Sequence, residues 1–406
     1  MTNDKNESDE DIASDVLPAA IDDDAVPILL DRLFPWHRPR KQFVRERQWV
    51  EHSRRLIDKL KNGHFLQNGP GGKPEIKYLT LPGIDYLDVR ELASCCANLN
   101  VGLTITGFLA GGEKNPARAR AQFREESLKE AGHISDRSST FSRRFEEISS
   151  VNGQAYRDLR RRGPFQVINV DACGSIALPS AGHAHRMVDA IFRIVELQLE
   201  LCTSRWLLFL TADVTKESYS VAALQNMSRA IAENAEGSRE FSDGTISLLA
   251  DSDITVVQAI DAASESSGER FVKLFSLGFA KWIMHLAGSK DWHLKMHNSY
   301  FYSTTPESSR FPSMPCLAFE FIPPSPGLED QFDVTNVEPL SRKNEENFAM
   351  RALSKVSEME DLDERMFSDH TLRAEMIATT KNMLREIGYT DSALKDLDKL
   401  DRAPAV

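Results

Sequence analysis

The sequence lacks the features that mark several specialised classes of protein. Its five cysteines include no Cys-x-x-Cys pair, so neither a structural zinc site nor a disulfide framework is predicted. Its most apolar helical segment, residues 274–288, is too short to cross a bilayer and contains Lys281. The N-terminal residues are polar and acidic, unlike a secretory signal peptide, and we therefore expect a cytoplasmic protein without membrane contact.

The chain also lacks net positive charge, because acidic residues outnumber basic ones. The 406 residues carry a net charge of −12, which argues against a protein that coats nucleic acid but allows a local basic patch. Hydrophobic residues make up 41% and charged residues 27% of the chain. These proportions are typical of a soluble globular protein, and the length is sufficient for a sizeable core.

Composition divides the chain into a tail, a central domain and two helical additions. Residues 1–24 are rich in Asp, Glu, Ser and Asn, and we predict a disordered acidic tail. Residues 25–68 read as a basic helical segment and residues 342–400 as a charged helical region. The central domain is expected at 75–325, with a helical insertion at about 216–266.

The central domain alternates strand and helix patterns. Strands are predicted at 77–83, 102–111, 133–136, 165–174 and 205–214, each followed by a helical stretch. Two further strand candidates, 292–305 and 315–324, have no crossover helix between them and therefore predict an antiparallel hairpin at the sheet edge. The predicted fold class is α/β, a doubly wound and mostly parallel sheet with its last strand antiparallel and helices added at both ends.

This chain order, five α/β units followed by one more helix and a β-hairpin, resembles the class I S-adenosylmethionine-dependent methyltransferases. The resemblance covers residues 78 to about 324, and it rests on topology and on strand-end loops rather than on a diagnostic motif. It implies a Rossmann-like domain that binds S-adenosylmethionine outside the carboxyl ends of its strands. A nicotinamide-dependent oxidoreductase is less well supported, because the first loop lacks Gly-x-Gly-x-x-Gly.

The strand-end loops supply the cofactor-binding residues that this resemblance implies: Pro82, Gly83, Asp85, Asp88, Glu113 and Asp136. In the loop after the first strand, Gly83 would admit the amino-acid part of the cofactor, and a carboxylate would receive its ammonium group. Glu113 would accept hydrogen bonds from the ribose, and Asp136 would lie near the adenine. The alternatives are a proline-glycine turn with Asp85 as a helix cap, and a solvated glutamate at Glu113.

The stretch FQVINVDACGSI (165–176) ends a strand with Asp171 and Gly174. Asp171 occupies the polar position of the Asp/Asn-Pro-Pro-Tyr/Phe loop that holds the target amine in amino-methylating members of the family. Both prolines and the aromatic residue are absent, so amino methylation of adenine or cytosine is not predicted. We expect Asp171 to position an acceptor, with His183 or His185 as a general base. The alternatives are a turn-forming aspartate and two loop histidines.

The basic segment concentrates cations and aromatic residues between Trp36 and Trp49. Arg38, Arg40, Lys41 and Arg45 are candidate substrate-binding residues, because interleaved guanidinium and aromatic groups suit phosphate contact and base stacking. Residues 37–61 are accordingly a candidate contact for a nucleic acid or a protein partner. The alternative is an amphipathic helix that docks through Phe43 and leaves its arginines in solvent. No metal is expected, since His293 and His297 have no acidic third ligand nearby.

Two functions from different classes fit the sequence. The first is an S-adenosylmethionine-dependent methyltransferase whose acceptor is a nucleic acid or, with less support, a protein or a small molecule. The second is a catalytically inactive Rossmann-like accessory or binding subunit of a multiprotein bacterial complex for defence or nucleic-acid processing. The acids at the strand ends favour the first function, whereas the glycine-poor first loop and the missing prolines favour the second.

Overall fold

The structure is a computed structural model that describes residues 33–69, 72–110, 116–178, 184–219, 221–250, 254–303, 311–324 and 343–400. The predicted acidic tail, Glu113 and His183 lie outside the described residues. Within the described ranges, no helix is both long and apolar enough to span a bilayer.

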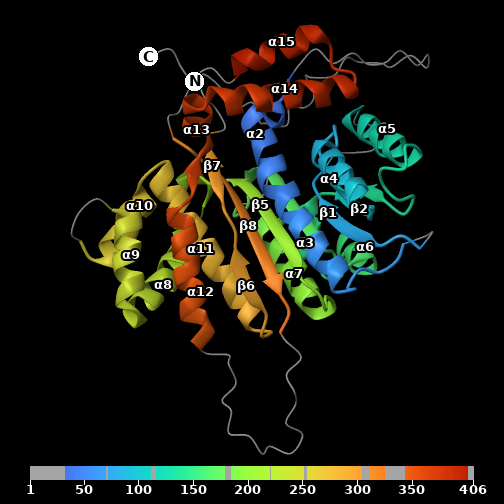
Figure 1. Cartoon of the computed structure of the whole chain (residues 1–406). Coiled ribbons are helices and arrows are strands. Elements are labelled where there is room, and N and C mark those ends of the chain that lie inside the picture. Colours follow the sequence, from blue (N-terminus) through green and yellow to red (C-terminus); the bar gives the residue numbers. More distant parts are fainter. Residues whose placement is uncertain are drawn as a thin grey trace, which may run out of the picture.

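One mixed sheet organises the molecule (Figure 1). Its main strands are β1 (Glu75–Thr80), β2 (Gly102–Phe108), β3 (Ser139–Phe141), β4 (Val167–Ser175), β5 (Trp206–Asp213), β6 (His293–Met296), β7 (Tyr300–Tyr302) and β8 (Met314–Ile322). The order across the sheet is β3-β2-β1-β4-β5-β8-β7, continued by the short β9 (Glu360–Asp361), and β6 also pairs with β8. Strands β1 to β5 are parallel, and β8 is antiparallel to β5.

The order and directions of these strands confirm the predicted doubly wound, methyltransferase-like fold. The final hairpin is also confirmed, with one change to its first strand. Residues predicted as a single strand at 292–305 form β6 and β7, which pair in succession with the same neighbour, β8. Residues 297–299 interrupt the strand between them.

The third strand was predicted at the wrong residues. The structure places β3 at Ser139–Phe141, whereas 133–136 belong to the turns that follow helix α5 (Pro116–Glu130). Gly132 adopts a φ of +69° and begins these turns, a conformation that glycine accepts without strain. The next element is the short 3-10 helix η3 (Phe145–Ser149) rather than an α-helix. This displacement changes which residues stand at the carboxyl end of the strand.

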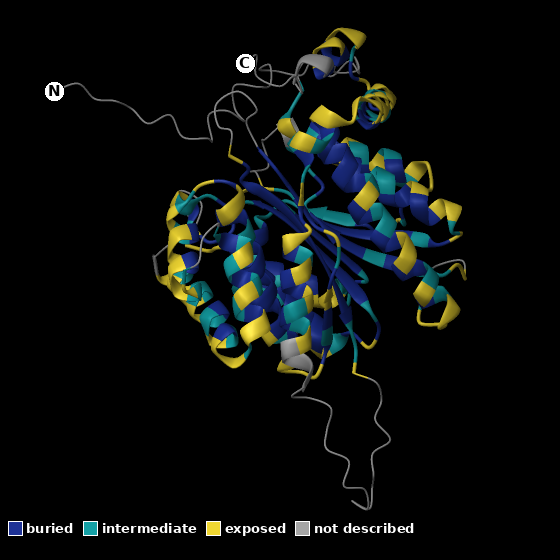
Figure 2. Cartoon of the chain, turned by 60° about the vertical axis from the view of Figure 1, so that its left-hand side comes forward, coloured by how far each residue is buried: buried dark blue, intermediate teal, exposed yellow. Residues whose placement is uncertain are grey.

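Helices cover both faces of the sheet and create two apolar cores. One core lies beneath α3 (Glu51–Asn62), α4 (Leu87–Asn98), α5 and α14 (His370–Glu386). The other lies beneath α7 (Met187–Leu201), α11 (Glu269–Gly288) and α12 (Lys343–Ser357). Figure 2 shows the strands buried between helices whose outer sides are exposed. Near-continuous apolar strands such as β5 are explained by this burial on two sides.

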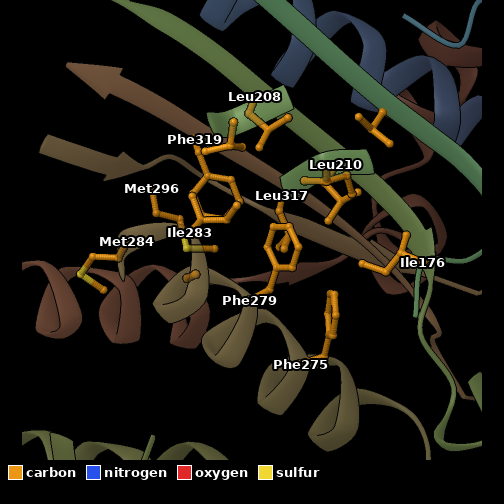
Figure 3. Packing of buried hydrophobic residues seen from close by; sticks show 14 of the residues in the cluster. Ile176, Leu208, Leu210, Phe275, Phe279, Ile283, Met284, Met296, Leu317 and Phe319 are labelled. Carbon is orange, nitrogen blue, oxygen red and sulfur yellow. The ribbon is translucent and has the colours of Figure 1, made fainter. Parts of the chain in front are cut away.

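The second core is built from strand and helix side chains that interdigitate. Leu208 of β5 and Phe319 of β8 face Phe279 and Ile283 of α11 across the interface (Figure 3). The rings of Trp206 and Phe321 stack with their centroids 3.7 Å apart. The predicted insertion folds as α8 (Val221–Gly237), α9 (Arg239–Leu249) and α10 (Val256–Glu265), and all three helices contribute buried residues to the same core.

The basic N-terminal segment is an integral layer of the fold. It comprises η1 (Pro35–His37), α2 (Pro39–Val44), the π-helical turn η2 (Arg45–Val50) and α3, which cross one face of the sheet in Figure 1. Phe43 meets Tyr300 edge to face at 5.2 Å. Gln48 Nε2 donates to the carbonyl oxygen of Cys316 at 2.8 Å. These contacts attach the segment to the antiparallel edge of the sheet.

A buried carboxylate, Glu320 of β8, ties this layer to the sheet. Lys59 Nζ lies 2.9 Å and Arg205 Nη1 3.0 Å from Glu320 Oε1, and His297 Nε2 lies 3.2 Å from Oε2. Burial alone would raise the pKa of Glu320, but the hydrogen bonds from His297, Lys59 and Arg205 lower this pKa far below its usual range. Ionised Glu320 therefore stabilises the folded state.

The C-terminal helices α13 (Leu362–Ser368), α14 and α15 (Asp391–Leu400) close one end of the molecule, at the top of Figure 1. Arg40 of α2 forms an ion pair with Asp363 of α13. Tyr389, between α14 and α15, donates a hydrogen bond of 3.1 Å to Asp85 in the loop after β1. The two helical additions thus meet each other and meet the carboxyl end of the central strand.

Candidate functional site

A crevice of about 470 Å³ opens at the carboxyl ends of the parallel strands. The loops that follow β1, β2 and β4 contribute to its wall, as does η3 after β3. Strands β1 and β4 are neighbours, but the chain proceeds outward from them in opposite directions across the sheet. This topological switch point is where ligands bind in open α/β sheets, and the volume lies in the range of small-molecule sites.

The strand order gives the two sides of the wall different side chains: two phenylalanine rings and one ion pair on the β2 and β3 side, and several acidic and basic groups on the β1 and β4 side. Phe108 ends β2 and Phe145 begins η3, with ring centroids 5.9 Å apart and the rings edge to face. Beside them, Arg144 Nη2 contacts Glu146 Oε1 at 3.0 Å. On the opposite side, across β1, lie Asp171 of β4 and other charged groups of the crevice. A ligand with a flat apolar part and a charged part matches this division.

The loop after β1 forms the floor between the two sides. Pro82 and Gly83 line the crevice, and Gly83 has a φ of +59°. A Cβ at Gly83 would meet no atom within 4 Å, so open space lies where its side chain would point. The backbone of Tyr86 also adopts the left-handed conformation, with a φ of 55°, and its hydroxyl group donates a hydrogen bond of 2.6 Å to Thr140 Oγ1.

Asp85 also lines the crevice, but its carboxylate is occupied by the protein. Oδ2 accepts from His37 Nε2 at 2.9 Å and from the hydroxyl group of Tyr389 at 3.1 Å, and Oδ1 forms an ion pair with Arg120. The backbone N–H of Phe34 donates to His37 Nδ1 at 3.1 Å, which leaves the proton of a neutral ring on Nε2. The sequence predicts that a carboxylate of this loop receives the ammonium group of the cofactor; the carboxylate of Asp85 instead anchors both helical additions to the β1 loop.

The pKa values of this network agree with that arrangement. Burial lowers the pKa of His37 more than Asp85 raises it, so the imidazole is neutral. Burial alone would raise the pKa of Asp85, but the hydrogen bond from His37 and the charge of Arg120 bring it below its usual range. Asp85 also does not cap α4, whose N-terminal capping residue is Tyr86.

Asp88 lies in the first turn of α4, where it is buried at the crevice wall. Its Oδ2 accepts from the hydroxyl group of Tyr78 at 2.7 Å and from Thr80 Oγ1 at 2.6 Å. Burial raises the pKa of Asp88, and these hydrogen bonds offset that effect only in part. The side chain of Asp88 is therefore held in place as a polar element of the wall.

Asp171 lies in the middle of β4, at the last position of its regular pairing with β5, and it lines the crevice and forms a partly buried ion pair with Lys41. Burial would lower the pKa of Lys41, but the charge of Asp171 raises it above the usual range, so the ammonium group stays protonated. The Lys41 nitrogen also lies 5.0 Å from the centroid of the Trp49 ring. Lys41 is thus the internal counter-charge of Asp171 and not part of a solvent-facing surface.

The other cations of the segment were also predicted to contact phosphate at the protein surface, but the structure buries them wholly or in part. Arg40 is only 3% exposed and donates to the carbonyl oxygen of Ser303 at 3.2 Å, besides pairing with Asp363. Arg45 is equally buried, and Arg38 is half-buried. The prediction failed because α2 docks against β7 and α13, which places its cations inside the protein.

Two further predicted residues lie away from the crevice. Asp136 lines a separate cavity of about 360 Å³ with Glu75 and Gly102, at the amino ends of β1 and β2. It cannot approach an adenine in the crevice, because β3 begins only after it. His185 is exposed, and its Nδ1 lies 2.8 Å from Ser149 Oγ. Within the described parts of the chain, no group of three or more His, Cys, Asp or Glu residues could hold a metal ion.

Sequence reasoning missed Arg144, Phe145 and Glu146 as residues of the crevice. Their segment, FSRRFEEISS (141–150), falls in the helical stretch that the sequence predicts after a strand at 133–136, a position too early for that strand. With β3 at its observed position, these residues follow the strand directly and stand at its carboxyl end. Trp36 was noted only for base stacking, yet it also lines the crevice.

The strand order and the crevice define a Rossmann-like α/β protein with a methyltransferase-like fold. The chain belongs to the PP_RS20740-like family, whose model matches residues 30–399. No curated protein matches the chain.

Two solved structures are similar to parts of this protein. One is a candidate rRNA methylase from Clostridium thermocellum, at 11% identity and a TM-score of 0.28, over 66% of this chain and 97% of that one. The other is PKMT2 from Rickettsia typhi, at 10% identity and a TM-score of 0.26, over 71% of this chain. The match spans 53% of PKMT2, about half of its length. The strand order described above, and not these two structures, defines the fold.

Proposed function

We propose that this protein binds S-adenosylmethionine in the crevice and transfers its methyl group to an acceptor, with nucleic acid as the acceptor class. The observation that carries the proposal is the crevice of about 470 Å³ at the switch point of the sheet. Its aromatic side, at Phe108 and Phe145, suits an adenine ring. Its charged side, at β1 and β4, suits the amino-acid part of the cofactor.

When bound, the cofactor supplies an electrophilic methyl group on sulfur. The protein's contribution is to hold the cofactor and acceptor in line and to exclude water. Pro82 and Gly83 keep the floor low between the two sides, and Asp171 stands at the acceptor side of the wall. Because Asp171 is paired with Lys41, it would orient an acceptor by accepting a hydrogen bond and not as a strong base.

We propose that a partner contacts only the exposed cations of residues 37–61. Arg40, Lys41 and Arg45 are buried, so the exposed cations of the segment are the ones that could meet a partner. Arg47, Arg54 and Arg55 have side chains that are 46%, 51% and 55% exposed. Each is close to an acid, which lowers the net positive charge that this surface presents.

A second candidate function is a cofactor-binding accessory subunit without catalysis. It is favoured by a specific observation: no histidine among the described residues lines the crevice, and the carboxylate of Asp171 is engaged by Lys41. A bacterial multiprotein complex for defence or nucleic-acid processing is the setting we propose for this alternative.

Calorimetric titration with S-adenosylmethionine and S-adenosylhomocysteine tests whether the crevice is a cofactor site. Gly83→Arg would fill the open space at the floor and should abolish binding. Gly132→Arg is the matched control, because Gly132 also has a positive φ and open space around it but lies away from the crevice. Micromolar binding that is lost only in Gly83→Arg supports the proposal, and no binding at millimolar ligand contradicts it.

Transfer of a radiolabelled methyl group then separates the two functions. Incorporation into DNA or RNA, lost in Gly83→Arg, identifies a methyltransferase with a nucleic-acid acceptor. Cofactor binding without transfer to DNA, RNA or co-purifying protein favours the accessory subunit.

A further inference from the structure

Arg45 places a buried positive charge at the wall of the crevice. Its side chain is only 3% exposed, on the turn η2 directly after α2. Nη2 donates to the carbonyl oxygen of Trp36 at 2.6 Å, and Nη1 donates to Gln42 Oε1 at 3.3 Å. These bonds orient the guanidinium group, but Nε is buried and has no hydrogen-bond partner among the described residues.

The acids around Arg45 are committed to other partners. The charges of Asp171, Asp88 and Glu91 act on it, yet none of them forms an ion pair with it among the described residues. Asp171 pairs with Lys41, and Asp88 accepts from two hydroxyl groups. Glu91 Oε1 accepts from Gln42 Nε2 at 2.6 Å. Burial lowers the pKa of Arg45, and these acids compensate only in part.

A second unsatisfied donor lies on the same crevice wall. The indole Nε1 of Trp36 is buried and has no hydrogen-bond partner among the described residues. Its ring is held by Phe34, which stacks on it with centroids 4.5 Å apart. Buried donors almost always meet an acceptor, so two donors at one wall that no described protein group satisfies are available to a ligand group that supplies oxygen atoms.

We propose that Arg45, assisted by the indole N–H of Trp36, binds a carboxylate group of the ligand in the crevice. A guanidinium group matches a carboxylate in charge and in planar geometry, and the interaction is strong in a site shielded from water. The inference rests on the proposed function, under which the group is the α-carboxylate of S-adenosylmethionine. Arg45 would thereby fix the charged end of the cofactor on the β1 and β4 side.

A pair of ligands that differ in this group tests the role of Arg45. S-adenosylhomocysteine carries the carboxylate, whereas 5′-methylthioadenosine lacks the whole amino-acid part. Arg45→Gln should weaken binding of S-adenosylhomocysteine by about 10- to 100-fold and change binding of 5′-methylthioadenosine by no more than about 2-fold. Arg160→Gln is the control and should leave both affinities unchanged, because Arg160 is an exposed arginine of α6 (Gln154–Arg162) outside the crevice.

Equal losses for both ligands, or no loss for either, would overturn the role of Arg45 and leave cofactor binding intact. If wild-type protein bound neither ligand, the proposed function and this inference would both be overturned. Trp36→Phe keeps the stacked ring and removes one donor, so we expect a loss of about 3- to 10-fold for S-adenosylhomocysteine alone.

The wild-type protein provides a test that does not depend on the folding of a variant at a buried position. Decarboxylated S-adenosylmethionine keeps the adenosine, the sulfonium and the ammonium groups and lacks only the carboxylate. We expect it to bind at least about 10-fold more weakly than S-adenosylmethionine. Equal affinities of the two ligands would overturn the inference directly.

Discussion

Replacing Asp171 by asparagine and Lys41 by methionine, singly and together, probes the ion pair that Lys41 forms with the middle of β4. The two side chains are unequally buried: 4% of Lys41 and 21% of Asp171 is exposed. Asp171→Asn leaves an ammonium group buried without its counter-charge and beside Arg45, and we expect it to reduce the free energy of unfolding by about 3–5 kcal/mol. Lys41→Met leaves a carboxylate that solvent in the crevice reaches, and we expect a smaller loss of about 1–3 kcal/mol.

The double variant supplies the decisive comparison. With both charges removed, neither group is left unpaired, so the loss should be smaller than that of Asp171→Asn alone. Urea unfolding followed by circular dichroism measures all three free energies against wild-type protein. Losses that simply add, or a Lys41→Met variant as unstable as Asp171→Asn, would refute the view that burial of the lysine charge controls the cost.

Three further perturbations test other parts of the structure. The pKa of Glu320 is lower in the folded protein, so ionised Glu320 stabilises the fold above its usual pKa of 4.5, and this stabilisation is lost as pH falls below that value. Glu320→Gln should therefore make the free energy of unfolding depend less on pH below 4.5. An unchanged pH dependence would contradict the ion-pair assignment. Gly107→Val would place a Cβ against Thr140 and should cost about 1–3 kcal/mol in urea unfolding. Tyr389→Phe removes the hydroxyl group that donates to Asp85, and the midpoint of thermal unfolding should fall by a measurable amount, equivalent to about 1 kcal/mol.

The parts of the fold that were predicted correctly have strong local patterns. The central strand β5 is a nearly continuous apolar run, and β4 begins with the apolar and β-branched residues of VINV; patterns of this kind are visible in a single sequence. The absence of a crossover helix before β8 likewise indicated an antiparallel final strand. Strand β3 could not be located from the sequence, because it is only three residues long and its residues are only partly buried. It therefore has no apolar run to identify it.

The candidate site was predicted in part for the same reason. Asp171 and Gly83 were found because each follows a run of strand-forming residues, although Asp171 lies inside β4 and not after it, and both line the crevice. Arg144 and Glu146 were missed because their strand was misplaced. Arg45 was identified as a ligand-contacting cation, but its assignment to an exposed surface followed from treating the segment as a helix with a solvated face.

The sequence by itself determined the order of strands and helices, because apolar periodicity is a property of neighbouring residues. Only the tertiary structure decided which charges meet. Lys41 and Asp171 are 130 positions apart in the chain, and Tyr389 and Asp85 are 304 positions apart. The choice of partner at such separations depends on how the N- and C-terminal helices dock on the sheet, and docking is set by packing over whole surfaces rather than by any local pattern. That docking turned a basic segment into a buried layer and left Arg45 at the wall of the crevice.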